Sequence, residues 1–294
     1  MNKYKLMIFF NGFLFFAMIG IFTSCLAANS DEIVLPIKLS PQGFPVATIQ
    51  IQGNDIPLIF DNGASRTTIT LSQEIVKKLA LKMTATNKKS CHHDDSGKET
   101  CLNVHNIPEI KIGQMTMHNV SCEQMDKLWG GHYDEGFVWF EAAKNGVIGL
   151  DLLRQFNVLV DYKNAQVILT KLGEYPSQYD VKRWTQVPFT NKYGITTAAK
   201  INGVDATIVW DTGANKSIIK TTSKIFAGKT SCESNNDPSC YFETTTFIVS
   251  DKQLPKTKFS IQKDELPFDG MIGSDFIEDH KVFFDFKNNV LFIE

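Results

Sequence analysis

The sequence has no concentrated basic segment and little net charge. Its 30 lysines and arginines are matched by 32 aspartates and glutamates, which leaves a formal net charge of −2 at pH 7. A protein that binds duplex nucleic acid needs a concentrated basic surface, because most of its affinity comes from neutralising phosphates. The sequence therefore argues against nucleic acid as a partner.

The sequence also lacks a spaced cluster of metal ligands. His92, His93, Asp94 and Asp95 are adjacent, so their side chains cannot all point at one ion, and no second cluster lies elsewhere in the chain. We interpret these four residues as the solvated tip of a loop. We expect neither a metal nor any other cofactor.

The N-terminus carries a long apolar stretch. Lys3 and Lys5 precede this stretch, which covers residues 6–22, and small residues follow it. This order is typical of an export signal, so we interpret residues 1–28 as a signal peptide and expect a periplasmic or secreted protein. Two alternatives remain open, namely lipidation at Cys25 and an uncleaved anchor. Contact with a membrane is expected only through one of these.

The remainder of the chain contains an internal repeat. An apolar run at residues 57–60 ends at Asp61, and a second run at residues 208–210 ends at Asp211. A polar residue, a glycine and an alanine follow each acid, and an alternating strand and a turn precede each run. Further matched blocks follow in the same order, at residues 146–153 and 270–277 and at residues 158–164 and 282–288. Matched blocks in one order predict two similar halves, and 294 residues are enough for two domains.

This order of motifs resembles the retropepsin-like aspartic peptidases. The chain has Asp-Thr-Gly-Ala, then two apolar residues with Gly-x-Asp, then a strand with an Asp-aromatic pair. The resemblance covers residues 35–294 and implies an all-β fold. Two retropepsin-like β-barrel lobes in one chain would then face an interlobe cleft across a pseudo-twofold axis, with short helices, as in pepsin-like enzymes. We place the lobes at residues 29–175 and 176–294, with residues 171–184 as the linker, and expect a monomer.

The resemblance implies that Asp61 and Asp211 form a catalytic pair. Two carboxyl groups held close together share one proton, because like charges repel. The ionised member can then activate a water molecule, while the protonated member hydrogen-bonds the peptide carbonyl. The loops beneath the acids would support them, with Thr212 reaching across the lobe interface. The predicted supporting residues are Asn62, Gly63, Ala64, Thr212, Gly213 and Ala214.

Asn62 departs from the family pattern, which has Thr or Ser at this position. Its amide offers a donor and an acceptor, so bonding across the lobes can persist, but it is bulkier and has no hydroxyl. The main prediction is an aspartic endopeptidase that hydrolyses extended peptides or proteins. The alternative is a catalytically weak or inactive peptide-binding or regulatory protein with the same bilobal fold.

The resemblance also implies how the cysteines pair. A cysteine pair follows each acid by a few tens of residues, where the family has the flap that covers the substrate. It therefore implies the disulfides Cys91–Cys101 and Cys232–Cys240. Cys122 is then either a buried thiol or a replacement partner in the first pair. Disulfides fit an exported protein.

Local patterns predict some of the remaining structure. Residues 33–39 form a strand, and a capping box at residues 70–73 opens a helix that runs to residue 81. Residues 83–103 are predicted as polar loop and flap. Residues 129–140 combine glycines with aromatics, and they line a substrate groove or form a packed surface insertion. The repeated acids interpreted as helix-start or turn residues are Asp151, Asp161, Asp275 and Asp285.

Overall fold

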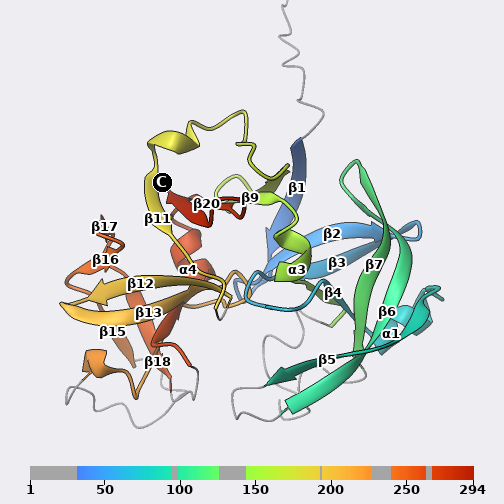
Figure 1. Ribbon diagram of the computed structural model, residues 1–294, viewed down its shortest axis with the longest axis horizontal. Helices are drawn as coiled ribbons and strands as arrows, with labels where there is room; N and C mark the ends of the chain where they lie inside the picture. Colours follow the sequence, from blue (N-terminus) through green and yellow to red (C-terminus); the bar gives the residue numbers. More distant parts are fainter. Residues whose placement is uncertain (1–31, 94–98, 126–143, 193, 227–239, 263–266) are drawn as a thin grey trace, which may run out of the picture.

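The protein consists mainly of β-strands arranged in two lobes (Figure 1). The computed structural model describes residues 32–93, 99–125, 144–192, 194–226, 240–262 and 267–294. The first lobe is blue to green and the second is orange to red, with a sheet joining them at the top of the view. The predicted all-β class with two lobes and short helices is confirmed.

The first lobe is built from the sheet order β2-β3-β8-β4-β7-β6-β5. These strands are β2 (Pro45–Ile51), β3 (Asn54–Phe60), β4 (Ile69–Ser72), β5 (Thr84–His93), β6 (Glu99–Ile112), β7 (Met115–Met125) and β8 (Gly146–Ile148). The helices of this half are α1 (Gln73–Lys78) and α3 (Leu150–Leu153). An additional pairing of β2 with β6 curls the sheet back on itself, which encloses a core of aliphatic side chains.

The second lobe follows the order β15-β18-β14-β19-β13-β12-β16-β17. Its strands are β12 (Ile195–Ile201), β13 (Val204–Trp210), β14 (Ile218–Lys220), β15 (Tyr241–Glu243), β16 (Phe247–Val249), β17 (Lys252–Leu254), β18 (Lys258–Gln262) and β19 (Gly270–Ile272). Its helical elements are the 3₁₀ turn η3 (Lys224–Phe226) and α4 (Ser274–Ile277). The central pairings match those of the first lobe, so the sequence repeat is a structural repeat.

The strands that deliver the two acids are equivalent in detail. In each lobe a hairpin turns at a glycine with positive φ, Gly53 at +81° and Gly203 at +84°, a backbone region that glycine occupies without strain. The outgoing strand then runs parallel to the Gly-containing block, as in the pairings Phe60↔Ile148 and Trp210↔Ile272. Asp61 and Asp211 each follow such a buried strand, so both acids lie at corresponding ends of the two lobe sheets.

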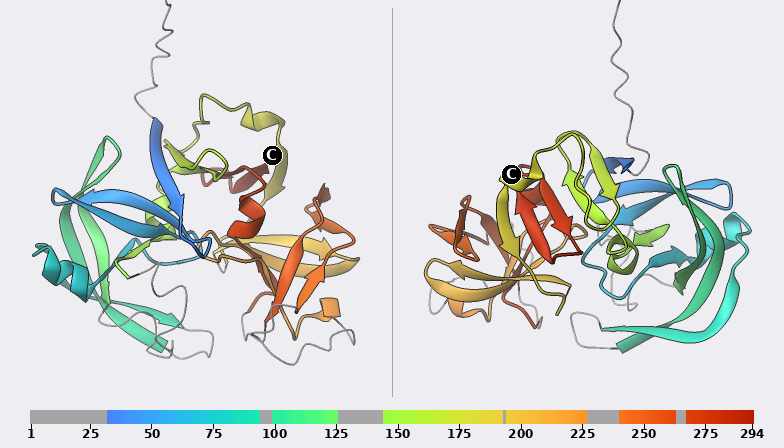
Figure 2. Two further views of the ribbon diagram at one scale, coloured as in Figure 1. Left: turned by 180° about the vertical axis from the view of Figure 1, so that it is seen from behind. Right: turned by 45° about the horizontal axis from the view of Figure 1, so that its top comes forward.

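A six-stranded sheet in the order β11-β21-β20-β9-β10-β1 joins the lobes. It contains β1 (Glu32–Leu39), β9 (Asn157–Asp161), β10 (Gln166–Thr170), β11 (Thr185–Pro188), β20 (Val282–Asp285) and β21 (Val290–Ile293). β9 and β20 pair antiparallel, and Leu159 pairs with Phe283, its equivalent in the repeat. The pseudo-twofold axis therefore passes between these two residues. Figure 2 shows the joining sheet from behind and from above.

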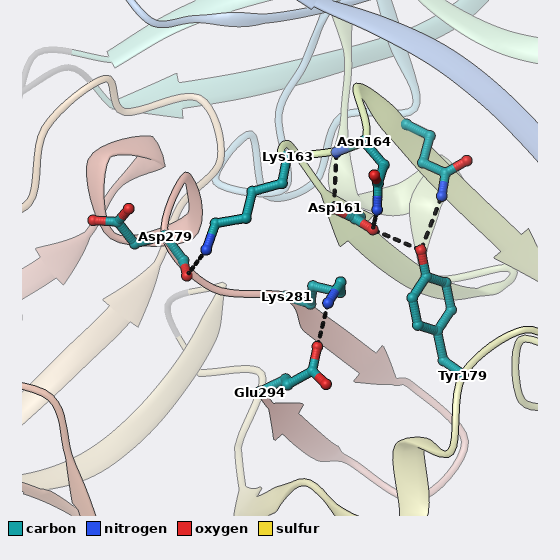
Figure 3. A network of polar contacts seen from close by, with 8 residues as sticks. Asp161, Lys163, Asn164, Tyr179, Asp279, Lys281 and Glu294 are labelled. Carbon is teal, nitrogen blue, oxygen red and sulfur yellow. Dashed lines mark hydrogen bonds and ion pairs between the residues drawn. The ribbon is translucent and has the colours of Figure 1, made fainter.

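The turns that follow β9 and β20 are held by the repeated acids. Asp161 Oδ2 accepts hydrogen bonds from Tyr179 Oη at 2.6 Å and from Asn164 Nδ2 at 2.6 Å (Figure 3). Asp285 accepts from the backbone and side chain of Asn288 in the same way. Both acids therefore act as turn residues, as predicted. Lys163, beside the first turn, donates to the Asp279 carbonyl oxygen of the other half at 3.0 Å.

Two local predictions for the first lobe were wrong. The helix α1 begins after Ser72, whose side chain accepts a hydrogen bond from Ile75 N, and it ends at Lys78. The proposed capping residue Thr70 lies in β4, because this segment pairs with both β7 and β8. The segment at residues 83–103 is mostly strand, since β5 and β6 pair as a long hairpin despite their polar sequence. Tertiary pairing outweighs local propensity at both places.

The disulfide Cys91–Cys101 joins β5 to β6, as predicted. Cys122 is a free, buried thiol, which excludes its exchange into this pair. Cys232 lies outside the described residues, so the pair Cys232–Cys240 stays a prediction. The signal segment and residues 129–140 also lie outside them. Of the four residues interpreted as a loop tip, His92 and His93 lie in β5 instead, while Asp94 and Asp95 lie outside the described residues. In the part of the chain that the structure describes, no helix is both long enough and apolar enough to cross a membrane.

The predicted linker connects β10 to β11. It has no strand and contains one 3₁₀ turn, η2 (Val181–Arg183). Its aromatic side chains Tyr175, Tyr179 and Trp184 pack against a buried cluster on one face of the joining sheet. The linker is thereby fixed against the sheet that both lobes share.

Candidate active site

Asp61 and Asp211 are brought together across the pseudo-twofold axis. Asp61 is buried and Asp211 is half-buried. A Cβ atom added to Gly63 would stand 2.1 Å from Asp211 Cγ, and one added to Gly213 would stand 2.2 Å from Asp61 Cγ. Each carboxyl group therefore packs on the glycine of the opposite loop. Only glycine leaves room for this reciprocal arrangement.

The backbone of each loop holds its own acid. Gly63 N and Ala64 N donate to Asp61 Oδ1 at 2.8 and 3.0 Å, and Gly213 N donates to Asp211 Oδ1 at 2.7 Å. The two carboxyl groups lie so close to each other that each changes the pKa of the other. Two carboxylates this close repel each other, and one shared proton relieves the repulsion. The arrangement therefore suits a pair that holds one proton between two acids.

The surroundings raise the pKa of both acids. Burial is the main cause of the raised pKa of Asp61. The charge of Asp211 and hydrogen bonding to it raise the pKa of Asp61 further, to well above the usual value. Burial also raises the pKa of Asp211, while its hydrogen bonds to Asp61, Gly213 and Ala214 act in the opposite direction. The two groups titrate as a coupled pair in which one carboxyl keeps its proton after the other has ionised.

Thr212 and Asn62 tie the two loops together. Thr212 Oγ1 accepts from Asn62 N at 3.0 Å and donates to the Phe60 carbonyl oxygen at 2.9 Å. In return, Asn62 Oδ1 accepts from Thr212 N at 2.7 Å. Both side chains are almost fully buried. The asparagine oxygen thus accepts a bond across the interface, as a hydroxyl in this position would.

One hydrogen-bond donor of the buried Asn62 side chain is not used. Its Nδ2 atom has no hydrogen-bond partner among the described residues. The pseudo-symmetric Thr212 hydroxyl uses its proton on the carbonyl of the residue before the opposite acid. The cross-lobe network is therefore complete on the Thr212 side and lacks one bond on the Asn62 side.

The glycines of the two repeated Gly-x-Asp blocks are needed for close packing behind the loops. A Cβ atom on Gly149 would stand 2.3 Å from the Thr67 carbonyl oxygen, and one on Gly273 would stand 2.5 Å from the Lys216 carbonyl carbon. The residues that follow them also bond to the loops, since Leu150 N donates to Ala64 O and Ser274 N donates to Ala214 O. These backbone hydrogen bonds hold Ala64 and Ala214 in position.

Sequence reasoning missed three polar residues of the second lobe that support the site. Ser217 donates to Asp275 Oδ1 from its backbone and its hydroxyl, at 2.8 and 2.7 Å. The Ser274 hydroxyl donates to the Thr212 carbonyl oxygen at 3.0 Å. Asn215 Nδ2 donates to the Gln42 carbonyl oxygen of the first lobe at 3.0 Å. Comparing the two halves position by position would have marked Ser274, because the first half has Leu150 there.

Comparison with known proteins identifies the first lobe. Residues 47–152 match the model of the family described as aspartyl protease, and this range contains Asp61 and the Gly149 block. Over this range the first lobe is similar to the aspartyl protease family. The second lobe repeats its topology and its acid-bearing loop.

The aspartyl protease fold extends over both lobes. The crystal structure of the aspartic proteinase from Irpex lacteus superposes with a TM-score of 0.57 and 12% sequence identity. The alignment covers 89% of this chain and 96% of that protein. No curated protein matches the chain in a sequence search. At this identity the structural match establishes the bilobal fold, and the chemistry has to be argued from the residues of this chain.

Proposed function

We propose that this protein is an aspartic endopeptidase that hydrolyses peptide bonds with Asp61, Asp211 and a water molecule. The observation that supports it most is the reciprocal packing of each carboxyl group on the glycine of the opposite loop. Two acids this close to each other, both with raised pKa values, are unfavourable for stability alone. Such an arrangement is typical of acid-base chemistry.

The reaction requires one proton on the pair. The ionised carboxyl takes a proton from a water molecule, whose oxygen attacks the carbonyl carbon of the peptide. The protonated carboxyl hydrogen-bonds the carbonyl oxygen and later protonates the leaving nitrogen. Backbone N–H groups of Gly63, Ala64 and Gly213 hold the Oδ1 atom of the acid in their own loop throughout. The substrate is a peptide or protein segment in an extended conformation between the lobes.

The test is peptide cleavage by single-acid variants. The mature protein is incubated with a mixed peptide library from pH 3 to 7, and products are read by mass spectrometry. Asp61→Asn and Asp211→Asn each remove the shared proton or its acceptor, so each abolishes cleavage. Asp205→Asn is the matched control, because Asp205 lies exposed near the start of β13, the strand that Asp211 follows, and its side chain pairs with Lys200. Cleavage by either active-site variant at the wild-type rate contradicts the proposal.

A second function, peptide binding without turnover, is favoured by the buried unpaired Nδ2 of Asn62. An incomplete cross-lobe network can leave the two acids slightly misaligned, and small displacements of reacting groups lower rates strongly. This candidate predicts calorimetric binding of a pepstatin-like inhibitor with no product from the library at any pH. Product formation by the wild type that both Asp variants lose excludes it.

We further propose that the protein is exported. The Cys91–Cys101 disulfide supports an oxidising compartment, and the N-terminal sequence has the order of a signal peptide. Mass spectrometry of the mature N-terminus distinguishes cleavage after Ala27 or Ala28 from lipidation at Cys25.

A further inference from the structure

Each acid loop ends in a buried hydroxyl residue that is bonded to a carboxylate. Thr67 and Ser217 each lie six positions after the acid of their loop, and both are fully buried. In the second lobe, Ser217 donates to Asp275 Oδ1, which belongs to the repeated Gly-x-Asp block. In the first lobe, Thr67 donates instead to Glu123 Oε2 at 3.5 Å, and Glu123 lies in β7. The two loops are therefore bonded to acids from different elements.

This change of acceptor coincides with a change of charge three positions after the acid of each block. In the first lobe this position holds Arg154, whose guanidinium pairs with Asp151 Oδ1 at 3.0 Å. In the second lobe it holds Glu278, a like charge that cannot form such a pair with Asp275. Arg154 thus engages Asp151, whereas Asp275 accepts from Ser217.

Glu123 is buried inside the first lobe. The residue is 4% exposed, and it pairs with Thr70 of β4 and with Val104 of β6. Thr70 is also fully buried, and its hydroxyl donates to the same Oε2 atom at 3.4 Å. One carboxylate oxygen thus connects the end of the Asp61 loop to the strand that follows it.

The fold itself does not require an acid on this strand. In the second lobe β18 takes the corresponding place, since it runs parallel to β14 as β7 runs parallel to β4. The sequence of β18, KFSIQ, contains no acidic residue. A carboxylate is costly to bury unless hydrogen bonds compensate it, so burial alone would favour an apolar residue at position 123. The acid is explained by the hydroxyl groups that it accepts from, one of which belongs to the Asp61 loop.

Thr67 links Glu123 to the catalytic acid of the first lobe. Its carbonyl oxygen packs against Gly149, where an added Cβ atom would stand 2.3 Å from it. The loop between Asp61 and Thr67 carries Gly63 and Ala64, whose backbone N–H groups donate to Asp61 Oδ1. A shift of Thr67 would therefore move the donors that orient Asp61.

We propose that Glu123 is a positioning residue that holds the Asp61 loop through the Thr67 hydroxyl. It has the same role for this loop as Asp275 has for the other loop. Glu123 acts through Thr67 and is not itself a catalytic residue. The inference rests on the proposed peptidase function, and it adds to that function a residue that lies outside the repeated motifs.

The first test compares Glu123→Gln and Thr67→Val with wild type in kinetics on a cleaved peptide. Glu123→Gln removes the charge of the acceptor, and Thr67→Val removes the donor, both with little change in size. We expect kcat to fall about tenfold in each variant with KM little changed, because a small displacement of Asp61 affects the reaction more than binding. The double variant should be no slower than the slower single variant, since both changes break one bond. Losses that multiply in the double variant would contradict the proposal.

Thr67→Ser separates the effect of the hydroxyl from the effect of side-chain volume. Serine keeps the donor and loses one methyl group, so kcat should stay close to the wild-type value even where the unfolding temperature falls. A loss of kcat as large as that in Thr67→Val would overturn the inference, because packing would then orient the loop. This comparison tests the proposal even if Glu123→Gln does not fold.

Glu109→Gln is the matched control. Glu109 lies on β6 with a half-exposed side chain, opposite His118 of β7. Its replacement makes the same chemical change on the neighbouring strand, so kcat and the unfolding temperature should stay at the wild-type values. An equal loss of kcat in Glu109→Gln and Glu123→Gln would contradict a specific role for Glu123.

A second readout separates this inference from the proposed function. Titration of the Asp carboxyl ¹³C resonances reports the acid pair whether or not the protein cleaves peptides. The bonds from Gly63 N and Ala64 N lower the pKa of Asp61, so a loosened loop should raise the apparent pKa values of the pair. We expect this rise in Glu123→Gln and not in Glu109→Gln. A wild type that cleaves nothing contradicts the peptidase function, whereas identical titration curves of the two variants contradict the role of Glu123.

Discussion

At the scale of single residues, the site depends on the absence of side chains as much as on their presence. Gly63 and Gly213 each give up the volume that the opposite carboxyl group occupies. Their backbone N–H groups also donate to the acid of their own loop. Each glycine thus makes room for the acid of the opposite loop and holds the acid of its own loop. This double use explains why each loop needs glycine two positions after its acid.

Gly213→Ala is expected to disrupt the acid pair. The new Cβ would stand 2.2 Å from Asp61 Cγ, so the loop or the acid must move. Displacement of about 1 Å lowers a reaction rate by roughly 100-fold, and kcat/KM should fall by at least that factor. Gly203→Ala is the control from the same lobe. Its Cβ meets open space, so the strain of its positive φ should lower stability by about 1 kcal/mol without changing kcat. Equal kinetics for the two variants would contradict this account.

Asn62→Thr tests the incomplete side of the cross-lobe network. Threonine would remove the buried unpaired Nδ2 and offer a hydroxyl that can accept from Thr212 N and donate to the opposite strand. Relief of one unsatisfied buried donor should raise the free energy of unfolding by about 1 kcal/mol. We expect kcat/KM to rise as well, because the two loops are held more firmly. A less stable and slower variant would show that the asparagine is the better fit.

At the scale of elements, the joining sheet depends on turns that hold an ionised acid. Burial alone would raise the pKa of Asp161, but hydrogen bonds from Tyr179 and Asn164 and the charge of Lys281 together bring it below its ordinary value. Lys281 also pairs with Glu294 at the C-terminus, and its ammonium lies over the Tyr179 ring. This group of contacts fastens the linker and the chain end to the turn after β9 (Figure 3).

The stability of this turn should depend on pH with a definite sign. Because the folded state lowers the Asp161 pKa, its ionised form stabilises the fold above the ordinary value of about 3.9, and this contribution is lost as pH falls through the lowered value. Asp161→Asn should therefore be less stable than wild type at pH 7, with a difference that narrows in acid. Urea unfolding from pH 2 to 7 measures this difference in stability between the variant and wild type. Asp251→Asn, on an exposed turn, should show little difference at any pH.

At the scale of the whole molecule, one chain provides both halves of the site. Each acid comes from its own lobe, and the pseudo-twofold axis runs between Leu159 and Phe283 in the joining sheet. The two central strands of this sheet come from different halves of the chain and pair directly. The second lobe thus supplies the acid loop that the first lobe alone would lack.

We therefore expect the protein to act as a monomer. Light scattering coupled to size exclusion should give the mass of one chain at micromolar concentration. Specific activity should stay constant on dilution from micromolar to nanomolar, because no subunit association is needed to bring the acids together. Activity that falls on dilution would indicate that the site is completed by a second copy.

The sequence by itself determined the repeat, the two lobes and the residues of the acid loops. These features are readable because they are local, since an apolar strand, an acid and a glycine lie side by side in the chain and occur twice. The short disulfide of the first lobe was readable from the family resemblance for the same reason. The β5 and β6 hairpin was not, because its polar residues become strand through the pairing of β5 with β6 and of β6 with β7.

The tertiary structure alone decided how the two loops meet. Asn62 and Thr212 are separated by 150 positions, yet their bonds set the distance between the acids. Packing across the axis also determined that Asn62 Nδ2 has no hydrogen-bond partner among the described residues. A sequence pattern indicates which residues each segment buries within its own lobe. Contacts across the pseudo-twofold axis depend instead on how the two complete lobes pack against each other.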